Sequence, residues 1–291
     1  STVLEILKEE SAAAHPGWAA YVSFDNFLSG ILHWKESTSP SPSGRHLGIY
    51  KSLATAYCDS GGEFAQELND DKTSVKDQAE AILRLIHGLA SSAAKGGFYL
   101  TYCWLIVINV MIYKKFGCLE LDKLRVIHLF EADFNLIIGI LFGRRAMHHA
   151  ADNNLLHKGQ YGQPGGECVD VAFTKILLNI TATLTKTAMG QFESDAASCF
   201  DRIVMLFAII GFLTLGAPVP AATMWLKTLQ HISHYVKTAF GLSKGHYKYT
   251  HEQPIVGPGQ GSKGGPVACS MITSPLLKAM DRLAIGISFC D

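Results

Sequence analysis

Three carboxylates and two aromatic side chains lie close together in one segment, Phe192-Glu193-Ser194-Asp195-Ala196-Ala197-Ser198-Cys199-Phe200-Asp201. Asp195 follows the apolar stretch 188–193, which we expect to form a short strand. A carboxylate at a strand end suits Mg²⁺, which prefers oxygen ligands and keeps positions open for phosphate oxygens. Taken alone, such an aspartate is more often a turn or cap residue. Two-metal phosphoryl transfer needs carboxylates from at least two segments, because the ions lie about 3.5–4 Å apart.

A glycine-rich string lies further along the chain, Gly257-Pro258-Gly259-Gln260-Gly261-Ser262-Lys263-Gly264-Gly265-Pro266. Glycine allows the backbone to come close to a ligand, and the Gln260 amide can form hydrogen bonds. A Gln-Gly-Ser string by itself would indicate nothing. It gains weight because it follows Asp195 at a suitable distance and precedes an expected helix over 267–283.

Two basic residues upstream are candidates for holding phosphate. Lys115 follows the run 104–113, whose β-branched residues predict a buried strand. Arg125 lies in 124–129, which we expect to be a second strand. The lysine would act as a point charge and the arginine as a bidentate donor. Solubilising surface charge explains Lys115 equally well.

In this order the strings resemble a reverse transcriptase of the non-long-terminal-repeat type, as found in retroelements of diatoms and other protists. The segment around Asp195 resembles motif A and the glycine-rich string resembles motif B. Segment 160–166 resembles a fingers segment, without its two usual arginines. The sequences of segments 39–51 and 128–133 are similar to those of these retroelement polymerases. The resemblance covers about residue 37 to the end.

The resemblance implies a fold as well as an activity. We expect a helix-rich α/β (α+β) chain with the fingers and part of the palm of a right-hand polymerase. The expected regions are an N-terminal helical segment (1–36), a fingers-like region (37–187) and a partial palm (188–291). The partners would be an RNA or DNA template–primer and a deoxynucleoside triphosphate, and the cofactor Mg²⁺.

The resemblance also implies roles for single residues. The metal ligands would be the catalytic Asp195 and the carbonyl of Ala196. Lys115 and Arg125 would hold the triphosphate. Phe200 would exclude a 2′-hydroxyl, and Gln260 and Gly261 would lie against the template–nucleotide pair. A plain core aromatic is the alternative for Phe200.

The chain also departs from the family pattern. Val126 stands where the family has proline, and Gly265 stands where it has serine. The aromatic-x-Asp-Asp string of motif C is not found, although Phe289-Cys290-Asp291 either begins it or precedes it. Because the second half of the metal site is missing from the sequence, we expect negligible polymerisation by this chain.

Further elements follow from periodicity and breakers. The amphipathic stretch 74–92 predicts a helix. Helices are also expected over 134–153, 169–185, 203–215 and 225–239, and a hairpin within 241–253. Alternating strands and helices predict a mixed fold.

Charge leaves the nucleic-acid interpretation open. The chain has 25 basic and 25 acidic residues, whereas nucleic-acid enzymes usually carry a basic surplus. Segment 221–263 is locally basic, with five lysines and four histidines against Glu252. One alternative is therefore a non-catalytic nucleic-acid-binding remnant that uses this stretch. A solvated surface explains the same charges.

Cysteine usage and hydropathy indicate a compartment. The seven cysteines are scattered and form no Cys-x-x-Cys pair, which favours a reduced, intracellular protein that is not secreted. The apolar run 203–218 falls short of the roughly 18–20 residues that span a bilayer, so we expect no membrane segment there. A small membrane-associated helical protein is the other alternative. The oligomeric state is left open.

Overall fold

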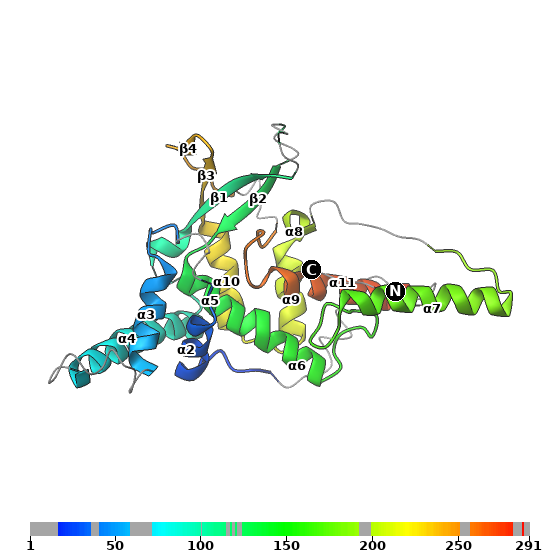
Figure 1. The fold of residues 1–291 in the computed structure, drawn as a ribbon, viewed down its shortest axis with the longest axis horizontal. Helices are drawn as coiled ribbons and strands as arrows, with labels where there is room; N and C mark the ends of the chain where they lie inside the picture. The colour runs from blue at the N-terminus through cyan, green and yellow to red at the C-terminus, as the bar shows by residue number, and fades with distance from the viewer. Residues whose placement is uncertain are drawn as a thin grey trace.

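The structure is a computed structural model that describes residues 17–35, 41–58, 72–99, 101–114, 117, 120, 124–191, 199–250, 257–281 and 287. A four-stranded sheet lies at one side of the molecule with the helices below it, and the chain is of the mixed α+β class (Figure 1). The predicted fold class is confirmed.

The sheet contains β1 (Ile106–Tyr113), β2 (Leu124–Leu129), β3 (Ser233–Thr238) and β4 (Gly241–Leu242), in the spatial order β2-β1-β3-β4. β1 pairs antiparallel with β2 and parallel with β3, and β4 pairs antiparallel with β3. The two strands predicted over 104–113 and 124–129 are confirmed. β1 begins in the core and ends at exposed residues, so one end of the sheet extends into solvent.

Helices pack below this sheet (Figure 1). α5, a π-helix and α6 run on from one another through the middle of the molecule, as predicted for 134–153. The other helices carry the N-terminal and C-terminal parts of the chain. The bounds are α2 (Phe24–Leu32), α3 (Leu47–Cys58), α4 (Lys72–Gly96), a 3-10 helix (Tyr102–Leu105), α5 (Ala132–Ile138), the π-helix (Gly139–Arg145), α6 (Ala146–Asp152), α7 (Cys168–Thr185), α8 (Cys199–Arg202), α9 (Met205–Thr214), α10 (Val219–His231) and α11 (Gly265–Met280).

Three large aromatic side chains lie at the centre of the core. Phe142 of the π-helix, Phe212 of α9 and Trp225 of α10 contact one another, with ring centroids 4.7–5.7 Å apart. All three are fully buried, and such pairs contribute about 0.5–1.5 kcal/mol each beyond the area they bury. The run 203–215 therefore forms a core helix, and its burial gives the membrane alternative no support from this segment.

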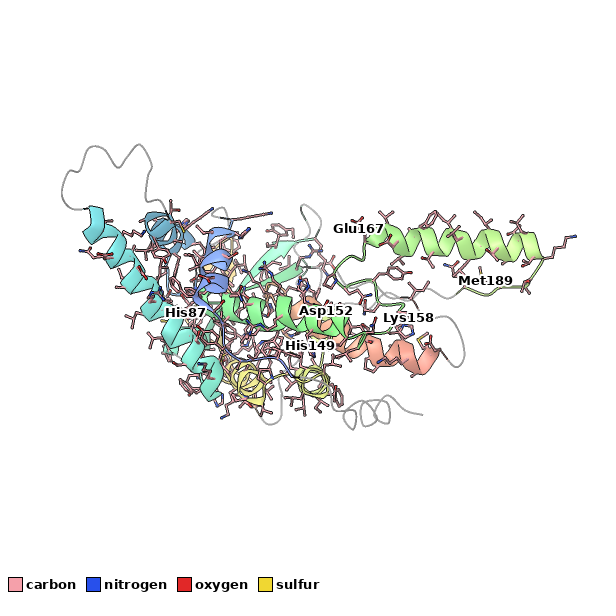
Figure 2. All side chains as sticks on the ribbon, turned by 90° about the horizontal axis from the view of Figure 1, so that it is seen from below. His87, His149, Asp152, Lys158, Glu167 and Met189 are labelled. Atoms are coloured by element: carbon pink, nitrogen blue, oxygen red, sulfur yellow. The ribbon has the colours of Figure 1, made fainter. Side chains whose placement is uncertain are left out.

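The structure corrects three local predictions. The helix predicted over 225–239 is confirmed for 225–231 but wrong beyond, because α10 ends at His231 and residues 233–237 of β3 pair with β1. The turn predicted within 241–253 lies earlier, between β3 and β4. The strand predicted over 188–193 was wrong for its described residues, 188–191, which form no strand. Figure 2 places Met189 beside α7 and away from the sheet, where this segment has no strand to pair with.

Helix α7 projects from the body of the molecule (Figures 1 and 2). None of its residues is buried, and it exposes Phe173, Ile176 and Leu184 among others. Its N-terminus has a capping box in which Glu167 and Asp170 bond each other's backbone N–H groups. Among the described residues, α7 is the one helix long and apolar enough to cross a membrane. Length and composition are the whole of that observation.

Candidate functional site

Three segments that are distant in the sequence meet beside the sheet. The glycine-rich loop 257–264 lies between β2 and α8. The His128 amide of β2 donates to the Gln260 carbonyl at 2.6 Å, and the Gly257 amide donates to the carbonyl of Ile203, just after α8, at 2.6 Å. The strand of Arg125, the segment of Phe200 and the loop of Gln260 are therefore joined by backbone hydrogen bonds.

Two glycines allow this approach. Gly257 and Gly261 have φ angles of +83° and +113°, which side chains other than glycine rarely adopt. A Cβ atom on Gly257 would overlap the Phe200 carbonyl oxygen, and one on Gly261 would overlap the His128 carbonyl oxygen. Glycine at these positions thus has a structural reason that is independent of any ligand.

Phe200 lies against the start of α11. A Cβ atom on Gly265 would lie 3.4 Å from Phe200 Cδ1, so the serine expected from the family would touch this ring. The Phe200 side chain is half-buried and packs against the hydrophobic core. These contacts fit both the predicted gate beside a nucleotide and the plain core aromatic.

The other described candidates are more exposed. Gln260 is half-buried and Gly261 is exposed at the tip of the loop. Arg125 is exposed on β2, where it pairs in register with Ile112. In the part of the chain that the structure describes, no hydrogen bond or ion pair joins Arg125 to Phe200 or Gln260.

The predicted metal ligands Asp195 and Ala196 lie outside the described residues. The same holds for Lys115 and for Phe289-Cys290-Asp291. Within those that are described, no group of three or more histidine, cysteine, aspartate or glutamate side chains could hold a metal ion.

A polar cluster that was not predicted from the sequence lies behind the glycine loop. The His234 ring stacks on Tyr247 at 4.7 Å between centroids and lies 6.1 Å from the ring of His128. Asn109 Nδ2 lies 3.4 Å from His234 Nδ1 and donates to the Tyr247 hydroxyl at 2.7 Å. Asn109 and His234 are only 1% and 4% exposed, so their side chains are buried. The available signal was an asparagine within an otherwise apolar strand.

Burial sets the charge of this cluster. Burial, together with the smaller effect of the neighbouring His128, lowers the pKa of His234 to about 4. Burial also lowers the pKa of His128, although the nearby Asp201 carboxylate acts in the opposite direction. Burial raises the pKa of Tyr249, whose ring lies 5.0 Å from that of His234, to about 12. The cluster is therefore uncharged at neutral pH, and it meets the loop where the His128 ring packs against Gly259.

Two of the strings that carried the resemblance bind each other. Segment 39–51 contributes Arg45, whose Nη2 atom lies 3.0 Å from Glu131 Oε1 in segment 128–133. The Ser43 hydroxyl donates to the same carboxylate at 2.8 Å, and the Ser43 amide donates at 3.3 Å. The Glu131 side chain is fully buried, so this pair fixes the loop that follows residue 41 to the start of α5.

No family model and no curated protein matches the sequence. The resemblance therefore rests on the ordered motifs and on the residues that carry them.

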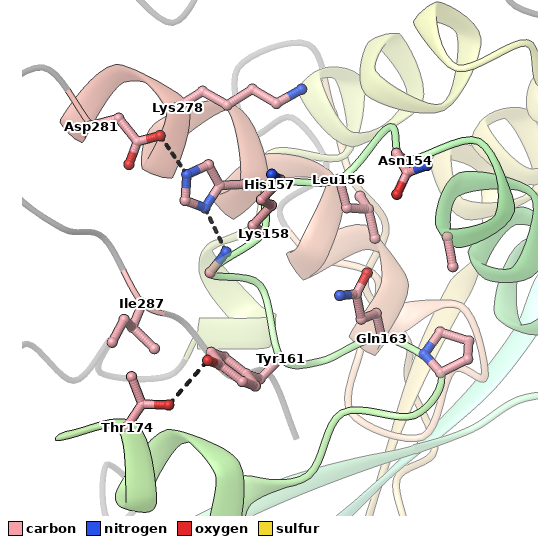
Figure 3. Close-up of a pocket in the computed structure, with 13 residues that line it drawn as sticks. Asn154, Leu156, His157, Lys158, Tyr161, Gln163, Thr174, Lys278, Asp281 and Ile287 are labelled. Atoms are coloured by element: carbon pink, nitrogen blue, oxygen red, sulfur yellow. Dashed lines mark hydrogen bonds and ion pairs between the residues drawn. The ribbon is translucent and has the colours of Figure 1, made fainter. Parts of the chain in front are cut away.

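Away from the glycine loop, a pocket of about 880 Å³ lies between the 154–164 loop, α7 and the end of α11 (Figure 3). Its His157 Nε2 atom lies 2.7 Å from Asp281 Oδ2, and His157 Nδ1 accepts the Gly159 amide at 2.9 Å. Since Nδ1 accepts, Nε2 carries the proton and donates to Asp281. Neither ring nitrogen is left to take a proton from a substrate, so this pair holds the loop on α11.

Proposed function

We propose that this chain is a reverse-transcriptase-like domain that binds an RNA or DNA template–primer and a nucleotide beside loop 257–264. Template-directed nucleotidyl transfer is the reaction of the family it resembles. The residues that would contact these partners are Arg125, Phe200, Gln260 and Gly261, with Lys115 as the second triphosphate ligand.

One observation carries the proposal. The motif-B-like loop 257–264 is hydrogen-bonded to Ile203, two residues after the motif-A-like segment, and to His128, three residues after Arg125. A chance match of short strings would not require residues 128, 203, 257 and 260 to share two backbone hydrogen bonds. Positioning of strand and nucleotide is the main contribution of a protein to phosphoryl transfer, and this assembly supports it.

The described residues do not supply a magnesium site. Burial lowers the pKa of His128, and the charge of the Asp201 carboxylate opposes this shift. Among the described residues, no group of three or more metal-ligating side chains includes Asp201. Magnesium held by Asp195 and the Ala196 carbonyl stays part of the proposal through the resemblance alone. Because the sequence contains no aromatic-x-Asp-Asp string, we propose that these 291 residues bind template–primer without extending it.

The test measures binding and extension together. We expect the purified chain to bind a labelled RNA–DNA hybrid at about 50 mM salt in a fluorescence anisotropy titration, with no extension of the primer when Mg²⁺ and nucleotides are added. Primer extension that disappears in Asp195→Ala would show that the chain is an active enzyme. No binding at low salt would refute the proposal altogether.

A non-catalytic nucleic-acid-binding function is the second candidate, and one feature favours it. The β3–β4 hairpin carries Lys237 and is followed by Lys244 and Lys248, all exposed. Phe240 at its turn is fully exposed, with a relative exposure of 102%. Exposed lysines beside an aromatic ring can follow a phosphate backbone and stack on a base. The hairpin lies at the free end of the sheet (Figure 1).

Replacing the three hairpin lysines separates the two candidates. If the hairpin alone binds nucleic acid, the triple change to glutamine abolishes binding. If the glycine-loop site also binds, residual affinity for the hybrid remains, and the slope of log affinity against log salt falls by about three. Lys175, Lys158 and Lys186 provide a matched triple control, because they lie on or near α7 and away from the hairpin.

A further inference from the structure

A pocket of about 390 Å³ opens on the side of loop 257–264 that faces the N-terminal helices. Its walls combine apolar and aromatic side chains with cations. The residues that matter most are Trp34, Ile127, Phe130, Lys35 and Lys263. Pockets of roughly 300–1,000 Å³ suit small ligands or a single unit of a polymer.

Lys263 is seated in this pocket by the helix beneath it. A Cβ atom on Gly139 would lie 2.6 Å from Lys263 Cδ, and one on Gly143 would lie 2.9 Å from the Lys263 carbonyl oxygen. The π-helix therefore leaves space for the lysine stem at Gly139 and for the Lys263 backbone carbonyl at Gly143. The Lys263 amide also donates to Asn135 Oδ1 at 2.8 Å, which fixes the backbone on the other side.

The Lys263 ammonium is directed over an aromatic ring. Its Nζ atom lies 5.6 Å from the centroid of Trp34, within the range of a cation–π contact. Trp34 is 7% exposed and is itself held edge-on against Tyr50 at 5.6 Å. Lys263 as a whole is exposed, so its ammonium group lies over a buried ring and stays accessible to a ligand.

The surroundings of Lys263 are positive. Lys35 lines the same pocket, and no carboxylate is among the described residues that line it. Burial lowers the pKa of the Lys263 amine, and the charge of nearby Arg144 lowers it further. Within the described part of the chain no acidic side chain pairs with Lys263, so an anion from outside would relieve this repulsion.

We propose that this pocket binds one nucleotide unit of a single strand, with Lys263 contacting its phosphate and Ile127 and Phe130 contacting its base or sugar. The inference rests on the proposed function, since it names a strand contact next to the same loop. A phosphate supplies the missing negative charge, and a flat, partly apolar base suits the remaining wall. A free mononucleotide has the same chemistry, so the experiment compares both sources.

The experiment uses the whole chain and two single variants. Lys263→Met removes the charge and keeps an unbranched stem. Lys95→Met is the matched control, because Lys95 of α4 is exposed, lies outside the basic stretch 221–263 and has its Nζ atom 4.7 Å from the centroid of the Tyr21 ring. Affinity for a 12-residue oligothymidylate is measured from low to moderate salt. We expect Lys263→Met to weaken binding about tenfold and to reduce the salt slope by about one, with Lys95→Met close to the parent chain.

Lysine labelling gives a readout that does not depend on a variant. An amine-reactive reagent at neutral pH is applied with and without ligand, and mass spectrometry reports each lysine. We expect the oligonucleotide to protect Lys263 several-fold and to leave Lys95 unprotected. Protection by thymidine monophosphate as well assigns the site to any nucleotide, whereas protection by the oligonucleotide alone assigns it to a strand.

The outcomes separate the pocket from the wider proposal. If the oligonucleotide binds and protects the hairpin lysines while Lys263 labels at its free rate, the pocket inference is overturned and the proposed function stands. Equal losses in Lys263→Met and Lys95→Met also overturn it, because they indicate a general charge effect. If no nucleic acid binds at low salt, both proposals fail.

Discussion

Replacing Gly261 by alanine should test whether loop 257–264 is held by backbone packing. Two costs add at this position. The φ angle of +113° strains an alanine by about 1–3 kcal/mol. A Cβ atom there would overlap the His128 carbonyl oxygen, so the loop must shift and lose the His128–Gln260 hydrogen bond, at about 0.5–1.5 kcal/mol. We expect the free energy of unfolding to fall by roughly 2–4 kcal/mol.

Two other glycines separate these costs. Gly44 also has a positive φ, +79°, but a Cβ atom there would meet nothing within 4 Å. Gly245 has neither the positive φ nor a close neighbour. Gly44→Ala should therefore show only the strain, about 1–2 kcal/mol, and Gly245→Ala should be nearly neutral or slightly stabilising.

Urea unfolding at neutral pH gives the three free energies, and hydrogen exchange reports the His128 amide. In Gly261→Ala we expect that amide to exchange faster while the β1 amides stay protected. If Gly261→Ala costs no more than Gly44→Ala and the His128 amide keeps its protection, the loop is not held as described. The assembly on which the proposed function rests would then lose its support.

The remaining predictions concern the polar cluster and the buried ion pair. His234 has a pKa of about 4 in the folded chain against 6.5 as the ordinary value, so stability should fall by roughly 3 kcal/mol as pH drops from about 6.5 to 4. Urea midpoints across that range should fall less steeply in His234→Gln than in the control His148→Gln. Arg45→Met should destabilise the chain, because the buried Glu131 carboxylate loses its ion-pair partner and, among the described residues, keeps only the Ser43 hydrogen bonds. Since Arg45 is itself 41% exposed, we expect the loss to be limited to about 1–3 kcal/mol. A double-mutant cycle with Glu131→Gln should recover part of this loss, and additive losses would contradict the pairing.

Local patterns predicted the elements whose stability comes from their own residues. The strand over 124–129 and the helices over 169–185 and 203–215 could be expected because their apolar periodicity or β-branched content acts within one segment. The residues 233–238 could not be assigned in this way. Their conformation is decided by parallel pairing with β1, which lies more than a hundred residues earlier in the chain.

The candidate site divides along the same line. The sequence by itself determined the order of Arg125, Phe200 and Gln260 and the glycines that permit a close backbone turn. Only the tertiary structure decided that this turn donates and accepts between β2 and α8, and that His128, His234 and Asn109 form an uncharged support behind it. It also decided that Lys263 lies over Trp34 along two glycines of the π-helix. Hydrogen bonds, burial and charge between distant segments depend on three-dimensional distance, and residue spacing along the chain does not contain that distance.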